Sequence, residues 1–419
     1  MTVSQAAHNL HPLRTELHNE LHARPSIYFN EPAHVFHMAL LEEGHTLDRI
    51  IRKLQAEQGN ANTQGSSQGL LKLGGFSMKW ERHTEFLSLT LVVPKPAGTE
   101  FWPAIPDCLA SLVAGHEHLI VECTQILVEA EDNWEGHTAR YGFKDPAGSQ
   151  IGTGDAVVWS DFRLSERDIN RILLINRSLN AYRLGRMVRR LLEIETYRMM
   201  ASLTLPVAKE VSSQLKDFER ELTILSDENA NANGTDARHM LKRISALSAR
   251  IVRYTAKTRQ RFSAADAYSQ IVFERISELR ESHVPGCQRL GVFIERRFKP
   301  TLRYCSATHQ RLERLSDSVA NLGELLQARV QVEVEEQNGA ILQSLNARAT
   351  TQIKIQKAVE GLSIIAISYY LLSLVKLVYE GLHGLGVDLS PKDAGLYVAP
   401  LVMAIICTIA YRIRKAQED

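Results

Sequence analysis

Two apolar runs near the end of the chain constrain its fold more than any other feature of the sequence. Residues 361–379 contain one charged side chain, Lys376, and residues 394–411 contain none. At a rise of about 1.5 Å per residue, each run covers nearly the thickness of a bilayer's hydrocarbon core. Buried core helices are the alternative, but residues 361–375 are apolar nearly all round rather than along one face. The sequence therefore predicts a two-helix transmembrane hairpin with a basic tail over residues 358–419.

Charges around the two runs predict the orientation of this hairpin. The cationic residues just outside it are Arg348, Lys354, Lys357, Arg412, Arg414 and Lys415. The connecting loop is slightly acidic and contains Glu380, Asp388 and Asp393. Because positive charge marks the cytoplasmic side of a membrane helix, we expect both termini in the cytoplasm. The first nine residues do not read as a secretory signal, so the chain is expected in the inner (cytoplasmic) membrane with its bulk inside the cell.

Composition argues against several kinds of partner and site. A formal net charge of +1 over 419 residues gives no global attraction to nucleic acid. The five cysteines are odd in number and show no C-x-x-C spacing. We therefore expect reduced thiols in a cytoplasmic protein, rather than a disulfide framework or a cysteine-rich zinc site.

Histidines are concentrated at the start of the chain. The first 45 residues contain His8, His11, His18, His22, His34, His37 and His45. A helix that begins near Pro12 and ends near Ala23 would place His11, His18 and His22 along one side. His18 and His22 are four residues apart and could bind a divalent metal ion, with His11 or a glutamate as third ligand. The alternative is that these side chains pack and form hydrogen bonds within the domain.

Strand and helix patterns alternate over residues 1–164. The predicted strands are residues 34–42, 76–81, 87–93, 119–128, 138–143 and 156–162, and the predicted helices are residues 46–55 and 103–114. The order β-α-β-β-α-β is typical of ferredoxin-like α+β domains with an added strand or two. The fold class expected for the chain is therefore α+β, beginning with a ferredoxin-like-type α/β cytoplasmic domain.

Motifs for catalysis are incomplete in this domain. Residues 152–154 read GTG, but they lack the third glycine and the Lys-Ser/Thr pair of a phosphate loop, which favours a simple turn. His116 and His118 could bind a metal from one side of a strand, and a solvated loop is the alternative. The motif H-E-x-x-H does not occur in the sequence. The sequence therefore gives no support for an enzyme.

From Ser165 onward the apolar periodicity is helical. Ser165 and Asp168 suggest the start of a helix that Pro206 kinks, and residues 211–225 follow a coiled-coil spacing. Polar turns at residues 227–236 and 284–286 predict three antiparallel helices, so we expect a helical stalk domain over residues 165–357. Its third helix would continue into the first apolar run as a rod of roughly 120 Å. The polar-sided rod and the short spans favour a homo-oligomer.

Three stretches of the sequence, two near its start and one near its end, resemble the hallmark motifs of a known family. Residues 11–14 read HPLR, residues 17–25 read LHNELHARP, and residues 359–370 read VEGLSIIAISYY. These stretches resemble the motifs of a bacterial family of membrane-anchored proteins of unassigned function (domain of unknown function 3422), and the likeness extends over nearly the whole chain. The resemblance implies a membrane anchor and supplies no activity.

The predicted layout is also similar to that of CorA-type magnesium channels. An α/β cytoplasmic domain, a long helix that enters the membrane, two C-terminal spans and a basic tail occur in those pentameric channels. They carry a Gly-Met-Asn signature after the first span, where this sequence reads YEGLHG over residues 379–384. None of their pore residues can therefore be carried over.

Together these features predict a membrane-anchored, oligomeric scaffold or sensor. It would display its α/β domain on the cytoplasmic face to a protein partner or a small ligand, with the lipid bilayer and further copies of the chain as its other partners. The alternative is a CorA-like divalent cation channel without the Gly-Met-Asn signature. In that case Glu380, Asp388 and Asp393 would concentrate cations at the outer mouth of the pore.

Overall fold

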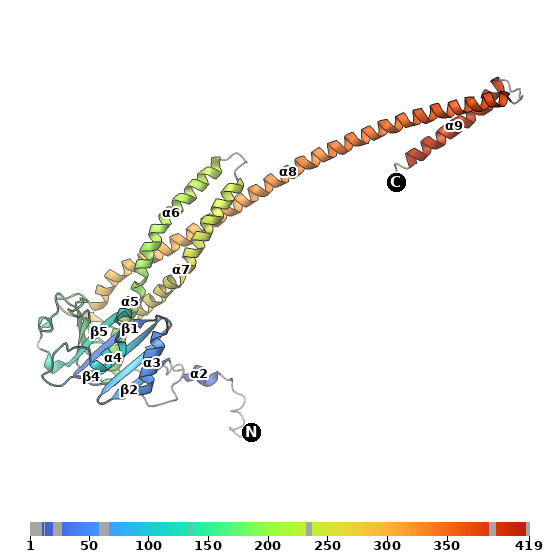
Figure 1. Ribbon diagram of the computed structural model, residues 1–419. Coiled ribbons are helices and arrows are strands. Elements are labelled where there is room, and N and C mark those ends of the chain that lie inside the picture. Colours follow the sequence, from blue (N-terminus) through green and yellow to red (C-terminus); the bar gives the residue numbers. More distant parts are fainter. Residues whose placement is uncertain are drawn as a thin grey trace, which may run out of the picture. The chain divides into compact units, whose positions relative to one another are not determined.

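The protein has a mixed α+β fold, seen here in a computed structural model. The structure describes residues 11, 13–19, 27–57, 67–134, 136–231, 237–384 and 391–415. The chain forms two compact units. Unit 1 comprises Met1–Asn231 and Met240–Gly323, and unit 2 comprises Ala232–His239 and Glu324–Asp419. Figure 1 labels the helices and several of the strands.

A nine-stranded sheet organises unit 1, as far as its residues are described. The strands are β1 (Ala33–Leu41), β2 (Gln68–Leu73), β3 (Phe76–Arg82), β4 (Phe86–Pro94), β5 (Ile120–Ala130), β6 (Ala147–Ile151), β7 (Ala156–Ser160), β8 (Asn170–Asn176) and β9 (Ser282–His283). Their order across the sheet is β2-β3-β4-β1-β5-β8-β7-β6-β9. β5 and β8 run parallel, and the other neighbours are antiparallel. The strands β1 and β5 therefore lie near the centre of the sheet.

Helices pack on both faces of this sheet. Side chains alternate between the two faces along a strand. Phe36 and Met38 of β1 belong to a core with α3 (Thr46–Glu57) and α4 (Asp107–Val113). Val35 and Ala39 point the other way and belong to a core with α5 (Ala181–Ser202). The alternation of β1 thus decides which of its residues lie beneath α5.

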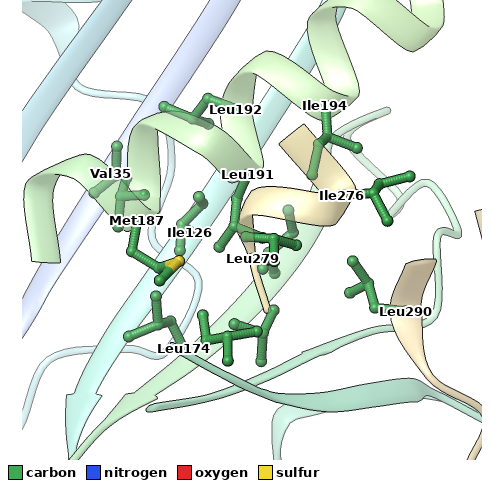
Figure 2. Close-up of a cluster of buried hydrophobic side chains, with 14 of the residues drawn as sticks. Val35, Ile126, Leu174, Met187, Leu191, Leu192, Ile194, Ile276, Leu279 and Leu290 are labelled. Atoms are coloured by element: carbon green, nitrogen blue, oxygen red, sulfur yellow. The ribbon is translucent and has the colours of Figure 1, made fainter. Parts of the chain in front are cut away.

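The core beneath α5 joins distant parts of the chain. Figure 2 shows strand residues Val35, Ile126 and Leu174 near Met187 and Leu191 of α5. The same core also receives Ile276 and Leu279 from the end of α7 and Leu290 from the start of α8. All of these side chains are at most 6% exposed. Their burial holds α5, α7 and α8 on one face of the sheet.

The predicted start of the helical region at Ser165 is wrong. The Ser165 hydroxyl accepts hydrogen bonds from the backbone N–H of Arg167 and of Ile169, at 3.4 and 3.3 Å, and so closes a turn rather than a helix. The next residues form β8, which is buried between β5 and β7. The first long helix, α5, begins after Asn180, whose side chain accepts a hydrogen bond from the N–H of Arg183. A short run that is apolar at successive positions fits a doubly buried strand as well as a helix.

A second prediction, a strand over residues 138–143, is also wrong. Residues Thr138–Tyr141 form a 3-10 helix that ends at Gly142, whose φ is 79°. The strand that follows is β6, and it forms a hairpin with β7. The turn of this hairpin contains Gly152, Thr153 and Gly154, all with positive φ, at 62°, 68° and 99°. The interpretation of GTG as a turn is therefore confirmed.

The connection between α7 and α8 closes one edge of the sheet. β9 lies in this connection and pairs with β6. The N–H of Gly152 donates to the carbonyl oxygen of Leu279, and the N–H of Gly148 donates to that of Gln288, both at 2.9 Å. The Ser149 hydroxyl donates to Glu281 at 2.9 Å. Backbone groups of β6 and its hairpin turn are thus hydrogen-bonded to residues between α7 and α8, more than 100 positions later in the sequence.

Unit 1 also contains three long helices that are linked to one another by ion pairs. They are α6 (Thr204–Asn231), α7 (Ala237–Glu278) and the first part of α8 (Leu290–Gly384). Glu221 pairs with Arg250 at 2.7 Å, and Glu210 pairs with Lys257 at 3.5 Å. Since residue numbers rise along α6 as they fall along α7, these two helices are antiparallel. Glu219 of α6 also pairs with Arg311 of α8.

Unit 2 contains the rest of α8 and helix α9 (Pro391–Lys415). In the described part of the chain, α8 is the one helix that is long and apolar enough to cross a membrane. None of its apolar window is buried. Leu362, Ile365 and Tyr370, for example, are 72%, 70% and 72% exposed. A shorter apolar stretch, Val398–Thr408, lies in α9.

Candidate functional site

The histidines predicted to bind a metal are only partly described. His11 and His18 are exposed, and His18 lies in α2 (Arg14–Asn19), whereas His22 lies outside the described residues. The N–H of Leu13 donates to Nδ1 of His11 at 3.2 Å. Among the described residues, no group of three or more His, Cys, Asp or Glu side chains is placed to hold a metal ion.

The predicted acidic pore mouth is represented by one residue. Glu380 is exposed near the end of α8, and its Oε1 lies 3.9 Å from the ammonium of Lys376, one turn earlier. Asp388 lies outside the described residues, and so does the side chain of Asp393.

A polar layer lies instead within unit 1, between the sheet and α5. Its centre is His37, which has the same orientation on β1 as Val35 and Ala39. Nδ1 of His37 lies 2.8 Å from Oγ1 of Thr90 on β4, and Nε2 lies 2.9 Å from Oγ1 of Thr196 on α5. Burial lowers the pKa of His37 to about 3. The imidazole is therefore neutral at physiological pH and links three elements by hydrogen bonds.

Next to this histidine lies a buried carboxyl group, that of Glu122 on β5. Its Oε2 is 3.6 Å from Nε2 of His37, and the side chain is only 3% exposed. In the part of the chain that is described, neither carboxyl oxygen of Glu122 has a hydrogen-bond partner. Burial, with a smaller effect of the negative charge of Glu195, raises its pKa to about 8, although the Thr124 hydroxyl lowers the pKa in part. Glu122 is thus mainly protonated at neutral pH.

An ion pair on α5 completes the polar layer. Oε2 of Glu195 accepts hydrogen bonds from Arg198 at 2.7 Å and from the amide nitrogen of Asn170 at 3.0 Å. The Glu195 side chain is 2% exposed, whereas that of Arg198 is 28% exposed. The carbonyl oxygen of the Asn170 side chain, Oδ1, has no hydrogen-bond partner among the described residues. The charge of Arg198 is therefore already balanced by Glu195. The carboxyl oxygens of Glu122 on β5 and Oδ1 of Asn170 on β8 have no hydrogen-bond partner among the described residues.

Two cavities meet this layer from different sides. The small cavity, of about 50 Å³, is lined by His37 and by the ion pairs Lys79–Glu81 and Arg189–Glu193. It has room for a few water molecules, and its charged groups are already paired. The large cavity, of about 480 Å³, is lined by Glu122, Asn170, Glu195 and Arg198. Its volume falls within the range of small-molecule sites.

Comparisons with known proteins decide the family. A model of the family described as "Protein of unknown function (DUF3422)" matches residues 9–417. The chain belongs to this family. No curated protein and no solved structure matches this DUF3422 chain, and its resemblance to CorA-type channels is not confirmed.

The arrangement in this DUF3422 protein is suited to binding rather than to covalent chemistry. Cys123 also lines the large cavity, but burial raises its pKa to about 12. Its thiol therefore stays protonated and is a poor nucleophile. His37 is held by two hydroxyl groups and has no free nitrogen for a general base. What the site offers is a set of buried hydrogen-bonding groups in a space larger than a water molecule.

The sequence placed some of these residues in strands without showing that they meet. Residues 34–42 and 119–128 were predicted as strands. The prediction is confirmed by β1, which contains His37, and by β5, which contains Glu122. A signal was present in β5, where Glu122 and Thr124 alternate in step with buried Ile126 and Val128. Polar residues on the buried side of a strand point to an internal site. The predicted pair His116 and His118 is not part of it, because His118 is exposed and lies 3.1 Å from Glu43.

We expect Glu195→Ala to destabilise unit 1 by about 2–3 kcal/mol, because it leaves the partly buried Arg198 without its partner. All four tryptophans, Trp80, Trp102, Trp134 and Trp159, lie in unit 1, so tryptophan fluorescence in urea measures this loss. Glu210→Ala is the matched control. It breaks a pair with Lys257 that is 54% and 68% exposed, so it should cost less than about 1 kcal/mol. Equal losses for the two variants would contradict the importance of the buried pair.

Proposed function

We propose that this protein is a membrane-anchored scaffold or sensor that presents unit 1 on the cytoplasmic face of the inner membrane. The observation that carries the proposal is the exposed apolar window of α8. Soluble proteins rarely expose a continuous apolar surface of that size, since each square ångström costs about 25 cal/mol in water. A bilayer around α8 and α9 would remove this cost. The two helices would then form a transmembrane hairpin with both termini in the cytoplasm.

Homo-oligomerisation is part of the proposal. Between the apolar window and unit 1, α8 exposes further large apolar side chains. Leu325, Ile341, Leu342 and Leu345 are 64%, 57%, 65% and 53% exposed. Leu345 lies four residues after Ile341 and three after Leu342, so it neighbours both of them on the surface of the helix. We propose that this side pairs with the same helix in another copy, as a coiled-coil stalk does.

The cytoplasmic part is proposed to contain a ferredoxin-like core. The strand order β3-β4-β1-β5, all antiparallel, supports this, and so do the two helices α3 and α4 on one face. They follow β1 and precede β5, as in the β-α-β-β-α-β pattern. Such a core serves many functions, so the proposed role depends on the polar layer and on α8. We propose the anchor rather than a channel because the anchor depends only on the exposed apolar window of α8.

A truncation after residue 357 tests the anchor. We expect the full chain to remain in the membrane pellet after an alkaline carbonate wash, and the truncated chain to appear almost entirely in the supernatant. The physical reason is the loss of the apolar window of α8, which is long enough to cross a bilayer, together with the shorter apolar stretch of α9. The fraction in the pellet is measured by immunoblot.

The control for this experiment changes apolar residues of α8 outside the window. The double variant Ile341→Lys, Leu342→Lys should stay in the membrane pellet but lose oligomers in light scattering of the detergent-solubilised protein. A full chain that washes off the membrane, or a truncated chain that stays with it, would contradict the anchor. An unchanged subunit number in the double variant would contradict only the proposed pairing.

A further inference from the structure

We propose that the large cavity binds a small primary ammonium compound with an aliphatic body, and that Glu122 is its counter-charge. This inference deepens the proposed sensor function and depends on it for its role in the cell. The binding itself is a property of unit 1.

Three unpartnered oxygen atoms mark the polar end of the cavity, and all three are acceptors when Glu122 is ionised. They are Oε1 and Oε2 of Glu122 and Oδ1 of Asn170, and none has a hydrogen-bond partner among the described residues. Glu122 and Asn170 are 5% and 7% exposed, and both line the large cavity. A buried polar group without a partner destabilises the folded protein. Three such atoms around one cavity are most simply explained by a ligand that supplies donors.

A primary ammonium group matches this set in number and in charge. It carries three N–H donors and no acceptor. The charged groups that line the cavity are Glu117, Glu122, Asp168, Glu195, Arg167 and Arg198, so carboxyl groups outnumber guanidinium groups. Arg198 is already held by Glu195 at 2.7 Å, which leaves it poorly placed to receive an anion. The cavity therefore favours a cation.

The rest of the lining excludes two other kinds of cation. A metal ion needs several ligands, and no group of three or more His, Cys, Asp or Glu is assembled among the residues that the structure describes. A quaternary ammonium group is usually held in an aromatic cage. The described lining of the large cavity contains no Phe, Tyr or Trp.

Aliphatic side chains form the other wall of the cavity. They include Met38, Ile105, Ile120, Leu164, Ile169 and Met199. With about 480 Å³ available, the cavity can hold an alkyl chain next to the ammonium group. The predicted ligand is thus amphipathic, with its charge at Glu122 and its carbon chain along this wall.

Ligand binding would couple to the protonation of Glu122. The titratable and charged groups around it are His37 on β1, Glu195 and Arg198 on α5, and Glu117, Arg167 and Asp168 in the loops. Since burial holds the pKa of Glu122 at about 8, binding of a cation to its ionised form releases a proton below that pH. We therefore expect the affinity to increase about tenfold for each unit by which the pH is raised, up to pH 8.

Calorimetry on the full chain in detergent tests the proposal. The probe is n-butylammonium, and 1-butanol and tetramethylammonium are the matched neutral and quaternary compounds. We expect binding of n-butylammonium only, weakened at least about tenfold by Glu122→Gln, because the charge is lost. Glu100→Gln, at an exposed position, should leave the affinity unchanged. Retained tryptophan fluorescence shows that each variant is folded.

Two outcomes would overturn the proposal. Equal binding of 1-butanol would show an apolar cavity without charge recognition, and absence of heat at millimolar n-butylammonium would show a cavity that only water occupies. Neither outcome depends on whether the protein stays in the membrane pellet, which is the test of the membrane anchor. Failure of the cation site and failure of the membrane anchor can therefore be told apart.

Discussion

Substitution of Gly185 by alanine is expected to destabilise unit 1 by about 3 kcal/mol, although in an exposed helix alanine is favoured over glycine by about 1 kcal/mol. Gly185 lies in the first turns of α5, and a Cβ at this position would lie 2.0 Å from the carbonyl oxygen of Ile27. That oxygen belongs to the backbone and cannot rotate away. The helix would have to move off the sheet, and the core in Figure 2 would open. The urea midpoint followed by tryptophan fluorescence measures the loss.

Gly323→Ala is the matched control for this substitution. It also lies within a helix of unit 1, but there the new Cβ would lie 3.9 Å from a methyl group of Ile244, an ordinary van der Waals contact. We expect this variant to be more stable than the parent, by up to about 1 kcal/mol. If both variants shifted the urea midpoint in the same direction, this would contradict the close packing of α5 against the backbone of Ile27.

Glu122→Gln is expected to stabilise the protein, and the gain should grow with pH. The pKa of Glu122 is about 8 in the folded protein, against an ordinary value of 4.5, because the side chain is buried. Between these two values the folded protein holds a proton that the unfolded chain releases, so the stability of the parent falls as pH rises. Glutamine has a similar shape and does not titrate. The expected gain is close to zero at pH 4 and about 3 kcal/mol at pH 7.

Urea unfolding of both proteins at pH 4, 5.5, 7 and 8.5 measures this difference. His37 titrates in both proteins, with a pKa lowered to about 3, so it reduces stability at low pH and largely cancels from the comparison. Glu100→Gln removes a carboxyl group at an exposed position and should show no trend. A gain for Glu122→Gln that stays constant across this range would show that the pKa of Glu122 is the same in the folded and unfolded states, contrary to the effect expected from its burial.

Much of the sheet could be predicted because its strands carry clear alternation. Residues 76–81 and 87–93 each have one apolar face, and they form the antiparallel pair β3 and β4. β8 could not be predicted in this way, since the run Ile172 to Ile175 is apolar at every position and buried on both faces. Periodicity does not separate such a strand from a buried helix. The error displaced the first helix from its observed start at Ala181.

The candidate site was beyond what local patterns can show. His37 and Glu122 come together because β1 pairs with β5, and Asn170 joins them because β8 runs parallel to β5. These pairings join positions that are far apart in the sequence. Glu195 joins the site because α5 packs on the sheet. The sequence analysis had assigned these residues to a longer helix that began at Ser165. The predicted metal ligands His11 and His18 instead lie at exposed positions, and His22 lies outside the described residues.

The pairing of β9 with β6 has a consequence for the behaviour of the protein at high concentration. A free edge strand offers unpaired N–H and C=O groups that can recruit a strand from another molecule. Here a segment from between α7 and α8 occupies the edge of β6. Copies held close together in a crowded setting are thereby kept from joining edge to edge into aggregates at this strand.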